Sequence, residues 1–454
     1  MTDLGSSCVR AMAAHLAEAI HRKTVSFEDP SKLDAAAFEG LHAFLRTAYP
    51  RIHDTLHLDE VGRFSLLYTW RGSDPTLGPV LLLAHQDVVP AEDEGGWRYP
   101  PFAGTIADGA VWGRGAIDVK GSLVAICEAV EALIGEGFRP RRTILLAFGH
   151  DEEVGGEQGA AKISDLLQSR GVHPLLICDE GGAITHDIVP GAAKPVALVG
   201  IAEKGYLSLE LKVQQPGGHA SMPPARTAIG ILCAAIDRLE RRPFPARVAG
   251  VPRLMLRHLA PHMPPAARLA VHSMPVFERL VRRQLLKQPS SAAMLRTTTA
   301  ATIFRAGVKD NLLPQEATAV INLRILPGET TQSTIDRVRK VVADDRVQLS
   351  TAGRLRTEPS PVADIRSPGF ELMRQTIAQI APDAAIAPCL VLGGTDSRHY
   401  TRLTPNIFRF GAMRITQDDL ATIHGNNERL TFENCELLMR FYTALLNNAD
   451  GLAR

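Results

Sequence analysis

Short apolar runs that alternate with helical patterns are the feature that most constrains the fold of this chain. Residues 79–89 (PVLLLAHQDVV), 142–153 (RTILLAFGHDEE) and 174–180 (PLLICDE) predict buried strands. Residues 122–137, which end at a glycine, and residues 161–171 predict helices between them. Strands that alternate with helices form a parallel or mixed sheet covered on both faces. The sequence therefore predicts an α/β fold with a mixed sheet flanked by helices.

Side chains that commonly bind metal ions stand where these strand-like runs end. His85 directly follows VLLLA, Glu152 and Glu153 come shortly after ILLAF, and Glu180 comes shortly after LLIC. Open α/β sheets form their sites at the carboxyl ends of the strands. We therefore expect these four side chains to lie together at one edge of the sheet.

The two further candidate ligands are Asp118, in a glycine-rich stretch, and His424, in the polar stretch IHGNNE (423–428). Asp118 stands between Gly115 and Gly121, where the backbone can approach a metal ion closely. Each motif alone is more often an ordinary acidic turn or a surface histidine, so the hypothesis rests on their conjunction in this order. Two imidazoles and three carboxylates suit a pair of Zn²⁺ ions. The predicted ligands of two zinc ions per chain are His85, Asp118, Glu153, Glu180 and His424.

A sixth residue, which is acidic, supplies the chemistry that such a site needs. Glu152 directly precedes the ligand Glu153, where a general base that takes a proton from the attacking water is required. Zinc-bound imidazoles usually donate their other N–H group to a carboxylate or carbonyl, and Asp87 could accept it from His85. These residues together predict a metal-dependent hydrolase.

The sequence pattern changes near residue 203. Residues 206–213 and 316–325 alternate apolar and polar side chains with period two, which predicts half-exposed strands, and 331–345 predict a helix. This block looks like a separate antiparallel sheet with helices on one face, inserted into the α/β domain. The predicted division is 1–202 for the first part of the catalytic domain, 203–352 for the inserted α+β domain and 353–454 for the second part of the catalytic domain.

Residues 241–296 form an unusually basic segment within the predicted insert. They contain eleven Lys or Arg residues and a single acid, Glu278, together with many Leu, Val, Met and Pro residues. The plainer interpretation is lid packing or a dimer contact. The competing interpretation is a surface that binds a membrane or a polyanion.

Composition bounds the remaining possibilities. At 454 residues, with 45% hydrophobic and 22% charged residues, the chain is expected to form two or three soluble globular domains. A formal net charge of +1 and 5% aromatic residues argue against nucleic-acid binding. Six singly scattered cysteines predict reduced thiols in a cytoplasmic protein, and the apolar runs are too short for stable membrane insertion.

Several motifs resemble one family over nearly the whole chain. It is the di-zinc metallopeptidase family that includes aminoacylase, carboxypeptidase S, glutamate carboxypeptidase and succinyl-diaminopimelate desuccinylase. The resemblance is greatest to the branch of carboxypeptidase S and the N-fatty-acyl-amino-acid hydrolases. It implies a di-zinc exopeptidase-like fold with an inserted lid and dimerisation domain, and a homodimer. The motifs are GHDEEVGG (149–156), DEGG (179–182), EKGYL (203–207), GGHAS (217–221) and GTDSRHY (394–400).

The resemblance also implies how the ligands are shared between the two metal ions. Asp118 is expected to bridge both ions, and the peptide bond after it is expected to be cis. His85 and Glu180 are expected on one ion, and Glu153 and His424 on the other. Asp179 remains an alternative to Glu180, which is favoured because it directly precedes the glycine of DEGG.

Further site residues follow from the same resemblance. Glu152 is the implied general base and Asp87 the residue that orients His85. His219 matches a histidine that stabilises the developing oxyanion, in several relatives from across a dimer interface. The resemblance leaves open whether His219 acts within its own chain or in the partner.

The substrate is expected to carry a free carboxylate. Asn311 and Arg324 match substrate-binding positions of the inserted domain, and Gly394 lies in the glycine-rich loop that carries Arg398. Arg398 or Arg324 would hold the carboxylate, because a guanidinium group offers two parallel hydrogen bonds. Gly394 is expected to lie beside the substrate.

We therefore expect a zinc-dependent hydrolase that cleaves the amide bond next to a free α-carboxylate, as a carboxypeptidase or dipeptidase does. The alternative is an N-acyl-amino-acid amidohydrolase, with residues 241–296 lining an entrance for a long acyl chain. A binding protein that has lost catalysis is a third interpretation, against which the intact Glu152 and His219 argue.

Overall fold

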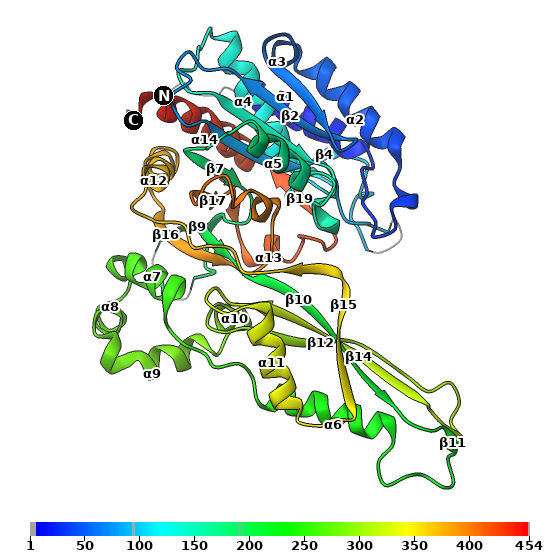
Figure 1. Ribbon diagram of the computed structural model, residues 1–454. Helices are drawn as coiled ribbons and strands as arrows, with labels where there is room; N and C mark the ends of the chain where they lie inside the picture. The colour runs from blue at the N-terminus through cyan, green and yellow to red at the C-terminus, as the bar shows by residue number, and fades with distance from the viewer. Residues whose placement is uncertain (1–5, 93–95, 190, 193, 453–454) are drawn as a thin grey trace.

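A computed structural model describes residues 6–92, 96–189, 191–192 and 194–452 (Figure 1). It contains a large sheet of ten strands among helices, and a small sheet of four strands below it in the view of Figure 1. Across the large sheet the order is β1 (His57–Val61), β2 (Ser65–Trp70), β6 (Ile144–Gly149), β3 (Val80–His85), β7 (Leu176–Asp179), β17 (Ile407–Arg409), β9 (Val196–Glu203), β8 (Ile184–Thr185) and β18 (Arg414–Ile415), with β16 (Ala385–Val391) also paired to β9.

The large sheet is mixed and is covered on both faces. Strand β3 pairs in parallel with β6 and β7, whereas β1, β2 and β6 pair antiparallel. Leu82 of β3 belongs to the hydrophobic core that includes α1 (Ser6–His21), α4 (Lys120–Gly135), α12 (Pro368–Ile380) and α14 (Phe432–Gly451). Its neighbours Leu81 and Leu83 face the core under α5 (Ala160–Ser169). The predicted mixed α/β sheet is confirmed.

The small sheet is antiparallel throughout. Its order is β12 (Thr298–Ala306), β14 (Glu316–Ile325), β10 (Gly205–Gln214) and β15 (Val347–Thr357). Alternate side chains of β10 are buried against α6 (Ala228–Arg241) and α11 (Thr331–Val342), as period-two patterning requires. The last strand of this sheet continues past residue 352 to Thr357.

A distal tip lies at the far end of the small sheet. It consists of β11 (Gly218–His219), which pairs antiparallel with β13 (Leu312–Leu313), and of the residues beside them, Ala220, Ser221 and Asn311. Figure 1 shows β11 at the end of the molecule farthest from β7 and β17.

The helices of residues 241–296 pack on the large sheet and not on the small sheet, whose strands flank them in sequence. Their helices are α7 (Gly250–Leu259), η3 (Ala260–His262), α8 (Pro265–His272), α9 (Met274–Leu285) and α10 (Pro289–Met294). Although the segment lies between two strands of the small sheet in sequence, Met255 and Leu256 of α7 are buried against Ala385 and Ala387 of β16. The segment therefore packs on the edge of the large sheet, because that edge offers an apolar strand to cover.

The remaining elements are short or lie at the periphery. They are η1 (Pro30–Lys32), α2 (Ala35–Ala48), α3 (Pro50–Thr55), η2 (Glu152–Val154), η4 (Asp396–Tyr400), α13 (Gln417–Leu420) and a three-stranded sheet of β19 (Arg429–Thr431), β5 (Ala110–Trp112) and β4 (Thr105–Ala107). Within the described ranges, no helix combines the length and the apolar composition that crossing a bilayer requires.

Candidate metal centre and active site

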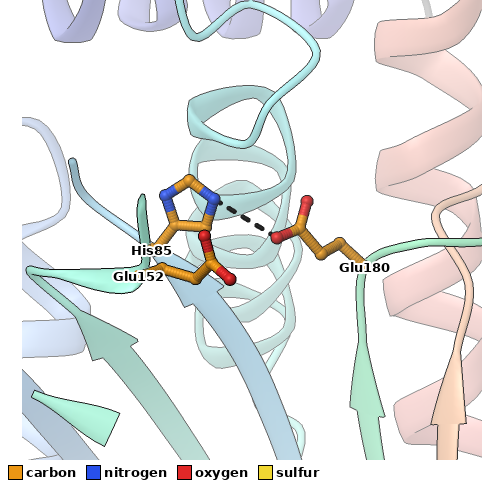
Figure 2. A group of neighbouring side chains, drawn as sticks. All are labelled: His85, Glu152 and Glu180. Carbon is orange, nitrogen blue, oxygen red and sulfur yellow. Dashed lines mark ion pairs between the residues drawn. The ribbon is translucent and has the colours of Figure 1, made fainter. Parts of the chain in front are cut away.

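The predicted strand-end residues meet at one edge of the large sheet. His85 is the last residue of β3, Glu180 follows β7 directly, and Glu152 and Glu153 open the short helix η2 that follows β6. Because β6, β3 and β7 are adjacent parallel strands, their carboxyl ends lie side by side. Figure 2 shows the side chains of His85, Glu152 and Glu180 converging from these strands.

Asp118 joins two groups of candidate metal ligands. Its Oδ1 atom lies 3.1 Å from Nε2 of His85, and its Oδ2 atom lies 3.0 Å from Nε2 of His424. Glu180 Oε1 lies 3.2 Å from the same nitrogen of His85, and Glu153 Oε2 lies 3.3 Å from the same nitrogen of His424. Each histidine therefore faces one oxygen of Asp118 and one glutamate, in the pairing that the resemblance implied.

The donor atoms of these residues fit divalent cations. Each group offers one imidazole nitrogen and carboxylate oxygens from two residues, which are usual zinc ligands. Glu153 Oε1 is buried and has no hydrogen-bond partner among the described residues. Burial opposes a charge on His85, but Glu180 and Asp118 outweigh it and hold the pKa of His85 well above its ordinary value. Hydrogen bonds to Asp118 and then Glu153 raise the pKa of His424 to about 10. The site therefore favours positive charge at both positions.

A buried glutamate that the sequence analysis missed holds the loop of Asp118. Glu428 is fully buried and accepts hydrogen bonds from the backbone N–H groups of Ile117 (2.8 Å) and Asp118 (3.1 Å). Its carboxylate also pairs with Arg114 at 2.7 Å. The peptide bond between Asp118 and Val119 is cis, as the resemblance implied. The only sequence signal for Glu428 is its position four residues after His424.

Asp87 contacts His85 and holds the backbone of the two adjacent glutamates. The Nδ1 atom of His85 lies 2.9 Å from the backbone carbonyl oxygen of Asp87 and 3.4 Å from its carboxylate. That carboxylate accepts hydrogen bonds from the N–H groups of Glu152 and Glu153, both at 3.1 Å, and from the hydroxyl group of Ser26 at 2.5 Å. Asp87 therefore holds the ring of His85 mainly through its carbonyl group, and its carboxylate positions the two glutamates.

Glu152 lies beside an arginine with unused hydrogen-bonding capacity. Removal from water raises the pKa of Glu152 well above its usual range, against the opposing effect of His85. Arg398 Nη1 lies 3.8 Å from Glu152 Oε1, and Arg398 Nε and Nη2 are buried without a hydrogen-bond partner among the described residues. Gly394 makes room for this guanidinium group, since a Cβ atom there would lie 3.1 Å from Nη1.

The structure places Glu180 and Asp179 in different roles. Asp179 is buried and accepts hydrogen bonds from the backbone N–H groups of Glu180 and Ser397, both at 2.9 Å. Its oxygens are thus occupied in joining two loops. Glu180 is the residue that faces His85, so the geometry favours it as the ligand.

A second buried pair that the sequence analysis missed supports the loop of Arg398. Glu203 and Arg409 are almost completely buried and form an ion pair at 2.8 Å. Glu203 also accepts a hydrogen bond from the hydroxyl group of Thr395 at 2.6 Å, three residues before Arg398. Glu203 opens the EKGYL motif, which is the only sequence signal that marks it.

Two of the three residues predicted in the inserted domain do not reach the candidate metal ligands within one chain. His219 and Asn311 lie exposed in the distal tip, at the far end of the small sheet (Figure 1). Nδ1 of His219 interacts only locally, with the hydroxyl group of Ser221 at 2.7 Å.

Arg324 lies at the opposite end of the small sheet from the distal tip. It is placed over the ring of Tyr206 with its guanidinium carbon 4.6 Å from the ring centre. Burial lowers the pKa of Arg324, and the positive charge of Arg398 lowers it further. Arg324 is therefore near the site, unlike His219 and Asn311.

Comparison with known proteins agrees with this geometry. The model of peptidase family M20/M25/M40 matches residues 81–448. A probable carboxypeptidase S-like 2 of Dictyostelium discoideum is 42% identical over 97% of this chain and 85% of that protein. The N-fatty-acyl-amino acid synthase/hydrolase PM20D1 of Homo sapiens is 40% identical over 97% of this chain and 88% of that protein.

Solved structures extend the comparison to the fold. The M20 family metallo-carboxypeptidase Sso-CP2 from Sulfolobus solfataricus has a TM-score of 0.70 at 15% identity, covering 97% of this chain and 99% of that chain. The resemblance drawn from the motifs is thus confirmed. The chain belongs to peptidase family M20/M25/M40 and is a metallohydrolase of its peptidase and amidohydrolase class.

Proposed function

We propose that the protein is a di-zinc carboxypeptidase or dipeptidase, which hydrolyses the amide bond next to a free α-carboxylate. The observation that carries this proposal is the guanidinium group of Arg398. Two of its nitrogens are buried without a partner, and it stands beside Glu152. Unpaired buried donors cost free energy, and a carboxylate satisfies a guanidinium group with two parallel bonds.

Residues of this chain would hold the metal ions in two sets that share Asp118. One set adds His85 and Glu180, and the other adds Glu153 and His424. When bound, the ions supply Lewis-acid activation of the scissile carbonyl group and of the attacking water.

Glu152 moves the proton in this proposal. A carboxylate oxygen of Glu152 accepts a proton from the attacking water as the water oxygen bonds to the carbonyl carbon. Glu152 then returns that proton to the amide nitrogen as the C–N bond breaks, so that the amine leaves neutral and an acid is formed. The raised pKa of Glu152 favours the first transfer, because it makes the carboxylate a stronger base.

We further propose a homodimer in which the distal tip of one chain completes the site of its partner. His219 and Asn311 are exposed and far from the metal-binding residues of their own chain. Strand β12 is an edge of the small sheet and exposes Ile303 and Phe304, at 43% and 45%. An exposed apolar edge strand is a ready surface for pairing with a second chain.

The second candidate function is hydrolysis of N-acyl amino acids, and one cavity favours it. A cavity of about 490 Å³ lies between α7 and the connections of the small sheet. Its lining is mostly apolar and includes Val251, Leu295, Leu326, Val362 and Leu390. An acyl tail buried there gains roughly 0.8 kcal/mol per CH₂ group.

A substrate panel separates the two candidates. Dipeptides and N-acyl amino acids of increasing chain length are hydrolysed by the zinc-loaded enzyme, and kcat/KM is compared. A steep rise with acyl length supports the second candidate, and a flat profile supports the peptidase. Substrates amidated at the carboxylate should be poor in either case, and equal turnover of acid and amide would contradict the role of Arg398.

Metal analysis tests the di-zinc proposal directly. We expect two zinc ions per chain in active protein, since five ligands with one shared carboxylate form two incomplete coordination shells. One ion per chain in fully active protein would contradict it.

We propose that 1–202 and 353–454 form the catalytic domain around the inserted 203–352, because the two sheets have separate hydrophobic cores. Strand β15 of the small sheet ends at Thr357, so the second boundary moves to that residue. We propose a cytoplasmic location because all six cysteines are free thiols.

A further inference from the structure

Helices α8 and α9 form a hairpin that is apolar on two opposite sides. The inner side buries Val271 and Met274 in the cluster that packs on β16, and Val281 packs against the same cluster. The outer side exposes Val276 and Leu280, which are 77% and 62% exposed. The inner side already fills the core, so the outer apolar residues are not needed for packing.

The outer apolar residues gather on one helix face. Val276 and Leu280 are four residues apart in α9, which places them one above the other. Leu269 of α8 is 59% exposed, and Leu286, just after α9, is 37% exposed. Singly scattered exposed apolar residues are ordinary, but four within one hairpin mark an interaction surface.

Positive charges surround these residues. Arg279, Arg283 and Lys287 are exposed and follow one another at four-residue spacing, next to Val276 and Leu280. In the described part of the chain, none of the three forms an ion pair with a carboxylate.

The charge of the segment is also uncompensated as a whole. Its one acid, Glu278, is already engaged with Arg282 at 3.2 Å. Eleven basic residues stand against one acid in 241–296, whereas the whole chain carries a net charge of only +1. The positive charge is therefore concentrated in this region.

Figure 1 shows α8 and α9 at the outer margin of the molecule, beyond α7. We propose that the outer face of the α8–α9 hairpin docks onto an anionic lipid surface. Its aliphatic side chains enter the boundary between headgroups and acyl chains, and its arginine and lysine side chains pair with lipid phosphates. Amphipathic helices that lie in a membrane interface combine these two features.

Two other occupants fit this face less well. A second copy seated on the same face would oppose its basic residues to each other, and like charges across an interface are costly. Single-stranded nucleic acid is bound by aromatic side chains that stack on bases. The exposed apolar residues here are Leu and Val, which have no such role.

Vesicle flotation tests the proposal with the full chain. We expect the protein to float with vesicles of phosphatidylglycerol mixed equally with phosphatidylcholine, and not with phosphatidylcholine alone. Added salt should weaken the binding, because the phosphate contacts are electrostatic. Failure to bind the anionic vesicles, or equal binding to both vesicles, would overturn the proposal.

Paired variants separate the two components of the surface. The double variant Arg283→Gln/Lys287→Gln should weaken binding about thirtyfold, since each basic residue near an anionic surface contributes about fivefold. Its matched control is Arg139→Gln/Arg141→Gln, which removes two exposed charges elsewhere and should bind as wild type.

A second variant and its matched control test the apolar component of the surface. Val276→Ser/Leu280→Ser should weaken vesicle binding by about tenfold or more. Ile106→Ser removes an exposed aliphatic side chain from β4, outside 241–296, and should bind as wild type. All four variants should hydrolyse a soluble substrate at the wild-type rate, which shows that they are folded.

Three further results would also overturn the lipid assignment. The first is vesicle binding by Val276→Ser/Leu280→Ser that equals wild type. The second is a change in the sedimentation mass of that variant, which would assign the face to a second copy. The third is tight binding of the wild type to a single-stranded oligonucleotide that the serine substitutions do not weaken.

Discussion

The strand-end residues of the large sheet and the distal tip carry the proposed catalytic groups under opposite conditions. His85 is 2% exposed, and the carboxylate of Asp87 beside it is held by the backbone of the two glutamates. His219 is exposed and interacts with Ser221, only two residues away. The residues around His85 are preorganised by the fold, whereas His219 in the distal tip is exposed to solvent.

The difference shows which part of the catalytic machinery one chain can complete alone. A site at the ends of adjacent parallel strands is held rigid by the sheet, and such preorganisation is what catalysis requires. The tip has no such support within its own chain. An exposed histidine that is catalytic must therefore obtain its surroundings from elsewhere, and in our proposal the partner chain supplies them.

Replacement of the general base should have the largest effect. Glu152→Gln keeps the shape of the side chain but cannot accept the proton, so kcat should fall by roughly 10²–10⁴-fold with metal content unchanged. Glu157→Gln removes an exposed acid from the same loop and is the matched control. If Glu152→Gln keeps more than about a tenth of wild-type kcat, its assignment as general base is wrong.

The distal tip should give the next largest effect. His219→Ala should lower kcat by roughly 10²–10³-fold, as loss of an oxyanion-stabilising group does, without loss of metal. Mixing it with Glu152→Gln should restore activity, because hybrid dimers then contain one site with both intact residues. Each variant alone at doubled concentration is the control. Absence of recovery, with subunit exchange demonstrated, would mean that His219 acts in its own chain or has no catalytic role.

The sequence predicted that the strand-end residues would lie together because each of them follows a recognisable strand, whereas Asp118 and His424 have no strand to mark them. His85 ends an apolar run that can only be a buried strand, and the carboxyl ends of parallel strands must meet. Strands β10 and β14 of the small sheet could also be predicted from local sequence, because half-buried strands alternate apolar and polar residues with a period of two.

Other features depend on contacts that leave no local pattern. Glu428 holds the backbone of Asp118 from more than 300 residues away, so nothing near either residue predicts the bond. The helices of 241–296 show amphipathic spacing, but spacing does not say which surface they cover. Their packing on β16 is decided by that strand's apolar edge, which lies far along the chain.

Glu428 offers a test of how far the rigid region depends on such support. Glu428→Gln should weaken metal binding by about 10–100-fold, as do changes to residues that hydrogen-bond to metal ligands and orient them. It also leaves Arg114 buried without its ionic partner, which should cost about 3–5 kcal/mol of unfolding free energy. Metal titration and denaturant unfolding measure the two effects. Glu433→Gln, on the exposed start of α14, is the control.

An unchanged metal affinity in Glu428→Gln would contradict this role. The Asp118 loop would then keep its shape without the buried carboxylate. The rigidity of the metal-binding region would have to come from the strand ends alone.

The smallest expected effect concerns the connection between the large sheet, which carries the candidate metal ligands, and the small sheet, which carries the distal tip. Lys204 lies between β9 of the large sheet and β10 of the small sheet, and its Nζ atom donates to the carbonyl groups of Ala293 (3.0 Å) and Arg296 (2.9 Å). Burial, and then the nearby charge of Arg324, lower the pKa of Lys204 from 10.5 to about 7. The folded state therefore holds this proton less tightly than the unfolded state does.

The consequence for stability has a definite sign. Between pH 7 and 10.5 the unfolded state binds more protons at Lys204, so this residue makes the free energy of unfolding rise with pH. Lys204→Met cannot titrate, and its unfolding free energy should rise less steeply across that window in denaturant titrations. Lys212→Met, on the surface of β10, is the matched control. Identical slopes in wild type and Lys204→Met would mean that the connection admits water and that the two sheets are less firmly connected than the buried lysine suggests.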